Sequence, residues 1–219
     1  MVSFNYENLN KKICLVFFIV SILVFIFFSV SSYSTAISNN LSSSVFRLHV
    51  IANSDSNVDQ ELKYKVKDSL INYMNSISIN SNSKQDVIEI AKNNLDNFKK
   101  IAEKVILEND FDYPVSVEIG NFGFPTKVYG DITFPAGYYD ALRVKIGQSS
   151  GQNWWCVMFP PLCFVDVTSG VVPEESKENL EKNLTEEEFN IISENNPVSG
   201  FKFKIVEIFN NFTMKLASK

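Results

Sequence analysis

The first thirty residues contain one long run of apolar residues. From Ile13 to Val30 the chain, "ICLVFFIVSILVFIFFSV", carries no charged residue and no proline. A helix of about 20 such residues crosses the hydrocarbon core of a bilayer. Because Lys11 and Lys12 precede the run, we expect the N-terminus to stay in the cytoplasm and the rest of the chain to be exported.

Two interpretations of residues 1–30 remain open, a secretory signal peptide and a transmembrane anchor. The apolar run is longer than the core of about 7–15 residues usual in a signal peptide, which favours an anchor. The small residues Ser34-Thr35-Ala36 are of the kind that a signal peptidase recognises, which favours cleavage. Residues 31–44, "SSYSTAISNNLSSS", are rich in Ser and Asn. They predict a flexible linker between the membrane and the folded domain.

Periodic patterns predict a strand and two amphipathic helices at the start of the folded domain. Phe46, Leu48 and Val50 alternate with other residues, which is typical of a strand. Helical spacing then occurs twice, in Val58, Leu62, Val66, Leu70, Tyr73 and Ile77 and in Val87, Ala91, Leu95, Phe98, Ala102 and Val105. The spacing of an N-terminal capping box occurs three times, in Ser56 with Asp59, Ser83 with Asp86, and Thr185 with Glu188.

The middle of the domain changes to strand patterns. Period-two alternation occurs at Val115, Val117 and Ile119 and at Leu142, Val144 and Ile146, and Pro and Gly mark the turns. Residues 154–159 are apolar throughout, which is typical of a strand covered on both faces. Strands that follow helices and pair mainly antiparallel place residues 45–170 in the α+β class. Residues 171–219 are predicted to be a helical, acidic C-terminal extension.

The charge of the exported part argues against nucleic acid as a partner. Beyond residue 30 there are 18 basic and 24 acidic residues, which gives a formal net charge of −6. Binding to phosphates depends on clustered Lys and Arg, and the chain has no basic block. We therefore expect no nucleic-acid partner, and the membrane is contacted through residues 13–30.

The exported part contains two cysteines, Cys156 and Cys163, in "WWCVMFPPLCF". In oxidising surroundings such a pair favours a disulfide, and the Pro-Pro between them turns the chain. The alternative is two buried free thiols that pack as small apolar groups. With one His, these cysteines supply too few ligands at recognisable spacing for a metal site, so no metal and no other cofactor is expected.

His49, the single histidine, raises the question of a catalytic pair with Cys156. A thiol nucleophile needs a base that generates the thiolate. The apolar run around Cys156 contains no glycine and no helix start, and a lone His on a strand is more often a packed residue. The acidic residues Asp55 and Asp59 resemble helix-start residues, where negative charge suits the helix dipole, more than a general acid and base. Asp140 is the third acidic candidate.

Three longer motifs resemble one known family. They are "FRLHVIANSDSNVDQELKYKVKD", "FPTKVYGDITFPAGYYDALRVKIG" and "GQNWWCVMFPPLCFVD", which together span about Phe46 to Asp166. In this order they are similar to the stage II sporulation protein R family of endospore-forming Firmicutes. The resemblance implies a signal that is made in the forespore and exported into the space between the two septal membranes. There it would trigger a membrane-embedded aspartic protease of the mother cell, which removes the pro-sequence of sigma-E.

The resemblance supplies no catalytic residue, and none is assigned. We expect His49, Asn53 and Asp55 to close the corner between strand and helix, because Asn and Asp side chains bond to nearby backbone groups. Four further residues are candidates for partner contact or for stabilising the corner: Arg143, Gln152, Asn153 and Trp154. The leading hypothesis is a non-enzymatic signalling protein. The alternatives are a secreted Cys/His hydrolase of peptide or cell-wall material and a wall-binding module.

Overall fold

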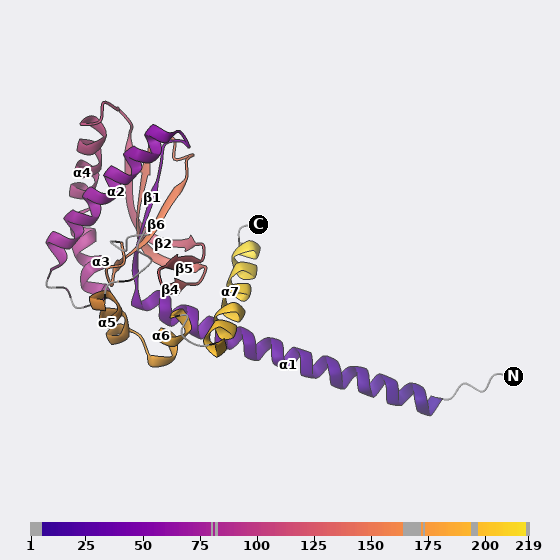
Figure 1. Cartoon of the computed structure of the whole chain (residues 1–219). Coiled ribbons are helices and arrows are strands. Elements are labelled where there is room, and N and C mark those ends of the chain that lie inside the picture. The colour runs from indigo at the N-terminus through magenta and orange to yellow at the C-terminus, as the bar shows by residue number, and fades with distance from the viewer. Residues whose placement is uncertain are drawn as a thin grey trace.

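The structure is a computed structural model that describes residues 6–79, 81, 83–163, 172, 174–193 and 197–217 (Figure 1). The helices are α1 (Tyr6–Ser44), α2 (Asn57–Ser78), α3 (Lys84–Asn93), α4 (Leu95–Leu107), α5 (Glu174–Asn183), α6 (Glu186–Ile192) and α7 (Pro197–Ala217). The strands are β1 (Phe46–Ile51), β2 (Val115–Phe124), β3 (Lys127–Tyr129), β4 (Ile132–Phe134), β5 (Gly137–Ile146) and β6 (Asn153–Phe159).

Four strands form the main sheet, in the order β2-β5-β1-β6. The outer pairs β2–β5 and β1–β6 are antiparallel, whereas β1 and β5 in the centre are parallel. The short strands β3 and β4 form a separate antiparallel pair. The prediction of an α+β fold with a mainly antiparallel sheet and a helical C-terminal part is therefore confirmed.

One face of the sheet packs against α2, α3 and α4, which lie together on that side in Figure 1. The first core contains Leu48 and Val50 of β1, and it includes the inward residues of the helices, among them Leu62, Val66, Leu70, Val87, Ala91, Phe98 and Ala102. The single second helix expected from the spacing is interrupted at Asn94. The Asn94 Nδ2 donates to the carbonyl of Ile90 (2.8 Å). Such side-chain bonds compete with the helical ladder, so the chain restarts there as α4.

The helix caps follow the sequence signals to different extents. The hydroxyl of Ser56 accepts the N–H of Asp59 (3.3 Å), but the Asp59 carboxylate bonds to other groups and does not complete a capping box. In contrast, Thr185 and Glu188 form a full box, since each side chain bonds to the other residue's backbone N–H. Pro173, just before α5, lies outside the described residues.

The expected flexible linker over residues 31–44 is not observed, because these residues continue α1 as a helix. Ser34, Ile37 and Leu41 recur at spacings of three and four, and all three are buried. Ile37 and Leu41 belong to a second core on the other face of the sheet. The serine hydroxyls near the end of α1, such as that of Ser44, donate to carbonyls within the helix. The helical spacing of the buried residues therefore predicts the structure of residues 31–44 better than their Ser/Asn-rich composition does.

The second core joins α1 to the C-terminal helices. It combines Ile37 and Leu41 with residues of β2, β4, β5 and β6 and with α5, α6 and α7, including Phe124, Phe134, Tyr139, Val157, Leu180, Ile191 and Val206. Beyond this core, the apolar half of α1 projects away from the domain (Figure 1). That half is long and apolar enough to cross a membrane, and it is not buried against the rest of the described structure.

Candidate functional site

The corner after β1 is held by the side chain of Asn53. Its Nδ2 donates to Asp59 Oδ2 at the start of α2 (2.9 Å), and its Oδ1 accepts the backbone N–H of Gln148 (2.9 Å). Its carbonyl accepts from both the N–H and the hydroxyl of Ser150 (3.1 and 2.7 Å). One residue thus joins β1, α2 and the turn between β5 and β6.

Two glycines allow this turn to approach the corner. Gly147 has a φ of +55°, a left-handed conformation that favours glycine, and a Cβ there would collide with the Asn53 side chain. A Cβ at Gly151 would collide with the carbonyl group of Ser54. The close contact between the turn and the corner therefore depends on both glycines.

Asp59 lies buried at the centre of the corner, with an exposed fraction of 3%. Burial by itself would raise the pKa of the Asp59 carboxyl. Hydrogen bonds from Ser54, Asn53 and Tyr113 outweigh the burial and lower that pKa below its ordinary value. The charged carboxylate is therefore a structural acceptor, which agrees with its expected place at a helix start.

Asp55 and Gln152 are brought together on the outside of the corner. The Asp55 Oδ1 accepts the backbone N–H of Gln152 (2.7 Å), and the Gln152 carbonyl accepts from Lys63 Nζ of α2 (3.2 Å). Lys63 is almost fully buried. Burial lowers the pKa of its amine, and the charge of Asp55 partly offsets this effect. These contacts tie the start of β6 to α2.

His49 lies on the second face of the sheet, away from the corner. Its Nε2 is 2.7 Å from Asn153 Oδ1, and its ring stacks on Trp155 with 3.6 Å between the ring centroids. Its Nδ1 is buried and has no hydrogen-bond partner in the described part of the chain. Burial lowers the pKa of His49 to about 4, and the charge of Arg143 adds to this effect. The imidazole is therefore neutral near pH 7.

Cys156 and His49 lie on opposite faces of the sheet. Cys156 is paired with Leu48 across β1 and belongs to the first core, whereas His49 is paired with Trp155. Since side chains alternate between the two faces along a strand, the Cys156 side chain points to the face opposite His49. A Cys156–His49 catalytic pair is therefore excluded by the geometry.

Cys156 is bonded to Cys163, as the first interpretation of the sequence predicted. The Cα atoms are 5.2 Å apart and the residues are separated by seven positions along the chain. We expect Cys163→Ser to lower the free energy of unfolding by about 2–3 kcal/mol, from the loop-closure entropy of such a short ring. Urea unfolding of the full-length protein in detergent, followed by tryptophan fluorescence, measures this change.

Reduction supplies the control for the disulfide. A reductant should destabilise the unmodified protein by a similar amount and leave the Cys163→Ser variant unchanged. Equal urea midpoints for the oxidised and reduced protein would show that the bond contributes no stability.

Arg143 is the centre of a partly exposed group on the second face, which we name the sheet-face cluster (Glu118, Phe122, Arg143, Lys145 and Asn153). The Arg143 guanidinium contacts Glu118 Oε1 through Nε (2.9 Å) and Nη2 (2.8 Å), and Lys145 Nζ lies 3.0 Å from the same oxygen. These contacts with Lys145 and Arg143 lower the pKa of Glu118. The guanidinium also lies 3.7 Å from the centroid of the Phe122 ring.

Trp154 is separated from the other candidates, because it points to the helical face. Its ring meets Tyr64 of α2 edge-on (5.5 Å between centroids), and Lys67 Nζ lies 4.5 Å from its centroid. The structure therefore divides the candidate residues into three groups. Asn53, Asp55 and the backbone of Gln152 form the corner, His49, Arg143 and Asn153 lie on the second face, and Trp154 contacts α2.

Sequence reasoning missed Arg47, which is fully buried beneath the second face. Its guanidinium lies 4.2 Å from the Phe124 ring centroid and 4.7 Å from that of Tyr139, and Nη2 donates to the Tyr129 hydroxyl (2.8 Å). The alternation in β1 suggested that one face of the strand is buried and the other exposed. In the structure β1 is a central strand, and both of its faces are covered. The nearby aromatic residues of the motif "FPTKVYGDITFPAGYYD" were the available signal.

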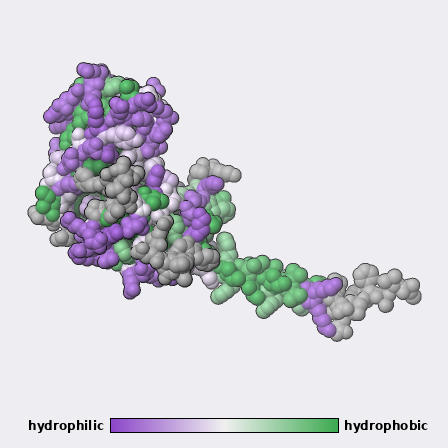
Figure 2. All heavy atoms as spheres, viewed as in Figure 1, coloured by the Kyte–Doolittle hydropathy of each residue, from purple (hydrophilic) through white to green (hydrophobic). Residues whose placement is uncertain are grey.

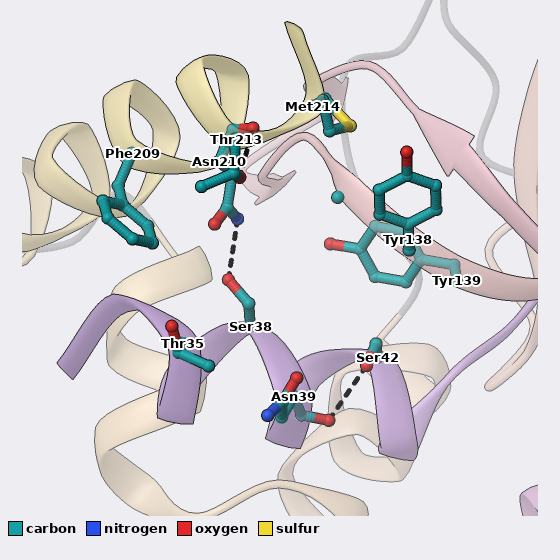
Figure 3. A pocket seen from close by; sticks show the side chains of 11 residues that line it. Thr35, Ser38, Asn39, Ser42, Tyr138, Tyr139, Phe209, Asn210, Thr213 and Met214 are labelled. Carbon is teal, nitrogen blue, oxygen red and sulfur yellow. Dashed lines mark hydrogen bonds between the residues drawn. The ribbon is translucent and has the colours of Figure 1, made fainter. Parts of the chain in front are cut away.

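A pocket of about 350 Å³ lies between α1, α7 and the start of β5 (Figure 3). Its walls are polar side chains of α1, such as Ser38 and Asn39, and Phe209, Asn210 and Met214 of α7. Among the described residues that line the pocket, none carries a carboxylate, an amine or an imidazole. Within the described residues, no three His, Cys, Asp or Glu side chains are grouped so as to hold a metal ion.

Comparisons with known proteins agree with the motifs. Residues 42–169 match the family model for stage II sporulation protein R. The chain is 36% identical over 141 residues to the stage II sporulation protein R of Bacillus subtilis (strain 168), a match that covers 64% of this chain. The chain spans 63% of the length of that relative. No solved structure matches the chain. The region matched by the family model contains the corner and the sheet-face cluster, whereas α5, α6 and α7 lie beyond it.

Proposed function

Because the chain belongs to the stage II sporulation protein R family, we propose that it is an exported sporulation signal that acts by protein contact. Its partner is a membrane-embedded aspartic protease that processes pro-sigma-E. The signal acts in the space between the forespore and mother-cell membranes. The observation that carries this proposal is the family match over residues 42–169, which contains all six strands and the helices α2, α3 and α4.

The hydrophobic half of α1 supports the export step. It is preceded by Lys11 and Lys12, and its side chains from Ile13 to Phe28 are mostly exposed to the surroundings. Such a segment is compatible with a signal peptide or with membrane attachment. We propose that it is retained as an anchor, because Ile37 and Leu41 of the same helix are part of the second core.

The candidate residues then have two separate roles. We propose that Asn53 and Asp55 hold the corner, because Asn53 bonds to Asp59 and to the N–H of Gln148, and Asp55 accepts the N–H of Gln152. The sheet-face cluster is the proposed contact with the protease, because Arg143 combines a partly exposed ion pair with an aromatic ring. Arginine and aromatic residues supply much of the binding energy at protein interfaces.

The hydrolase alternative is not supported by the geometry of its two proposed residues. Cys156 is in a disulfide and lies on the opposite face of the sheet from His49. We therefore infer that the chain is not a thiol hydrolase. For the wall-binding alternative, cosedimentation of the full-length protein with peptidoglycan gives a direct check.

Arg143→Ala tests the contact role. We expect it to reduce pro-sigma-E processing about tenfold or more in sporulating cells, because a central arginine at an interface contributes about 2 kcal/mol or more. The abundance of the exported protein should not change, since Glu118 keeps its ion pair with Lys145. Immunoblots of sigma-E and of the exported protein measure both quantities.

The matched control for Arg143 is Lys104→Ala, on the outer surface of α4. Lys104 is exposed, and within the described part of the chain its side chain forms only a helical ion pair with Glu108 (3.7 Å). Processing should be normal in this variant. If Arg143→Ala lowers abundance and processing in parallel, its role is structural, and normal processing in Arg143→Ala would show that the cluster is not the contact.

A further inference from the structure

The C-terminal helix α7 has two different faces. Val206 and Asn210 are buried at 0% and 6% exposure, one turn apart, and face the domain. Ile208, Phe212 and Leu216 are 61%, 55% and 59% exposed. Each exposed residue follows an inward position by two residues, which is about 200° around a helix. The exposed residues therefore form one apolar stripe on the outer side of α7.

The inner face of α7 is bonded to the part of α1 that follows the apolar run, beyond Val30. The Asn210 Nδ2 donates to the Ser38 hydroxyl of α1 (2.7 Å) and to the Ala136 carbonyl (2.7 Å), and the first of these bonds is drawn in Figure 3. Ser38 lies eight residues beyond Val30. At about 1.5 Å per residue this places the crossing point about 12 Å from the end of the apolar run.

A second contact lies still nearer to the apolar run. Lys202 Nζ is 2.8 Å from Glu187 Oε1, and the same oxygen accepts from the Tyr33 hydroxyl (3.2 Å). Tyr33 is three residues beyond Val30, about 4–5 Å along the helix axis. Tyrosine at this position is typical of the boundary between membrane and water. The contact places the beginning of α7 close to that boundary.

These distances match the depth of the lipid headgroups. The headgroup layer adds about 5–8 Å on each side of the hydrocarbon core. A helix with its side chains has a radius of about 5–6 Å, so the outer side chains of α7 reach that layer. Figure 2 shows hydrophobic atoms on α7 beside the place where the apolar half of α1 projects.

We propose that α7 is an interfacial membrane helix, and that Ile208, Phe212 and Leu216 insert into the headgroup layer. Lipid is the occupant of the stripe because α7 is bonded to the segment that enters the bilayer. The proposal requires that α1 stays in the membrane, and it does not depend on protease activation.

Depth-dependent quenching tests this proposal with the full-length protein in vesicles of phosphatidylcholine and phosphatidylglycerol. Cys14→Ser removes the free cysteine, and Phe212→Cys then supplies one site for a bimane label. The matched control is Leu107→Cys, an equally exposed apolar position (63%) at the end of α4. A third label at Leu23→Cys reports whether α1 is inserted.

We expect spin-labelled lipid to quench the label at position 212 severalfold more than the label at position 107, and aqueous iodide to show the opposite order. Equal quenching at the two positions would overturn the proposal, as would a lack of lipid quenching at position 23. If position 212 is shielded from both quenchers only at high protein-to-lipid ratio, a second copy covers the stripe. Shielding that requires added protease would instead identify a protein partner, and either outcome overturns the lipid assignment.

Discussion

Lowering the pH from about 7 to about 4.5 is expected to destabilise the domain by about 2 kcal/mol through His49 alone. The pKa of His49 falls from 6.5 to about 4 on folding, with burial as the main cause. The unfolded chain therefore binds a proton between these two values and the folded chain does not. Stability is highest above pH 6.5 and is lost as the pH falls toward 4.

The composition makes this measurement unusually clear, because His49 is the single histidine of the chain. Asp59 and Glu118 have lowered pKa values in the fold, so their contributions are lost only as the pH falls below their ordinary values of 3.8 and 4.5. Urea unfolding of the full-length protein in detergent, repeated across this pH range, measures the free energy of unfolding at each pH.

His49→Gln is the matched variant for the pH experiment. Its amide can bond to Asn153 in place of the imidazole, and it carries no charge at any of these pH values. The loss of stability between pH 6.5 and 4.5 should disappear in this variant. An unchanged pH profile in His49→Gln would show that His49 titrates alike in the folded and unfolded chain.

Asn53→Ala is expected to lower the free energy of unfolding by about 2–4 kcal/mol. The substitution removes the hydrogen bonds to Asp59 and to the N–H of Gln148. The buried Asp59 carboxylate then keeps its charge with one donor fewer, which is more costly than the loss of an exposed bond. The same unfolding assay measures the effect at pH 7, and the exported protein should also be less abundant in cells.

Gly147→Ala tests whether Asn53 acts through its contact with the turn. In the otherwise unchanged protein this substitution should be strongly destabilising, because the added Cβ collides with the Asn53 side chain and the φ of +55° disfavours alanine. In the Asn53→Ala background the collision is relieved, so the cost of Gly147→Ala should fall by about 1 kcal/mol or more. Additive effects of the two substitutions would contradict the direct contact between these residues.

A surface asparagine provides the control for Asn53. Asn93, the last residue of α3, is exposed and makes no side-chain hydrogen bond in the described structure. Asn93→Ala should change stability by less than about 0.5 kcal/mol. A loss at Asn93 as large as that at Asn53 would mean that the corner bonds are not the cause.

The strands and helices that have a buried apolar face could be predicted from the sequence. Leu48 and Val50 in β1, and Leu62, Val66 and Leu70 in α2, show their periods because burial selects for them. Residues 31–44 misled the prediction because serine and asparagine dominate their composition. Their helix is held by Ile37 and Leu41, whose partners in β2, β5 and the C-terminal helices are distant in sequence.

The candidate site was harder to predict than the fold. Turn chemistry predicts that Asn53 and Asp55 lie at the corner, but of their side-chain bonds only the one from Asn53 to Asp59 is local in sequence. The bonds to the N–H groups of Gln148 and Gln152 span 95 and 97 positions, so they form only when the turn between β5 and β6 is packed on the corner. The second face is different, because Arg143 meets Glu118 only when β2 and β5 are paired. Arg47 could not be placed either, since its aromatic neighbours are assembled by tertiary packing.

The absence of a hinge between the apolar half of α1 and the domain restricts how the proposed signal can reach its receptor. The helix runs without a break through Ser44, and Leu41 is fully buried. With α1 held in the bilayer, the domain cannot move away from its own membrane on a flexible linker. The distance of the domain from that membrane is then set by the helical residues 31–44 of α1. Communication with a protease in an opposing membrane would then depend on how closely the two bilayers approach each other.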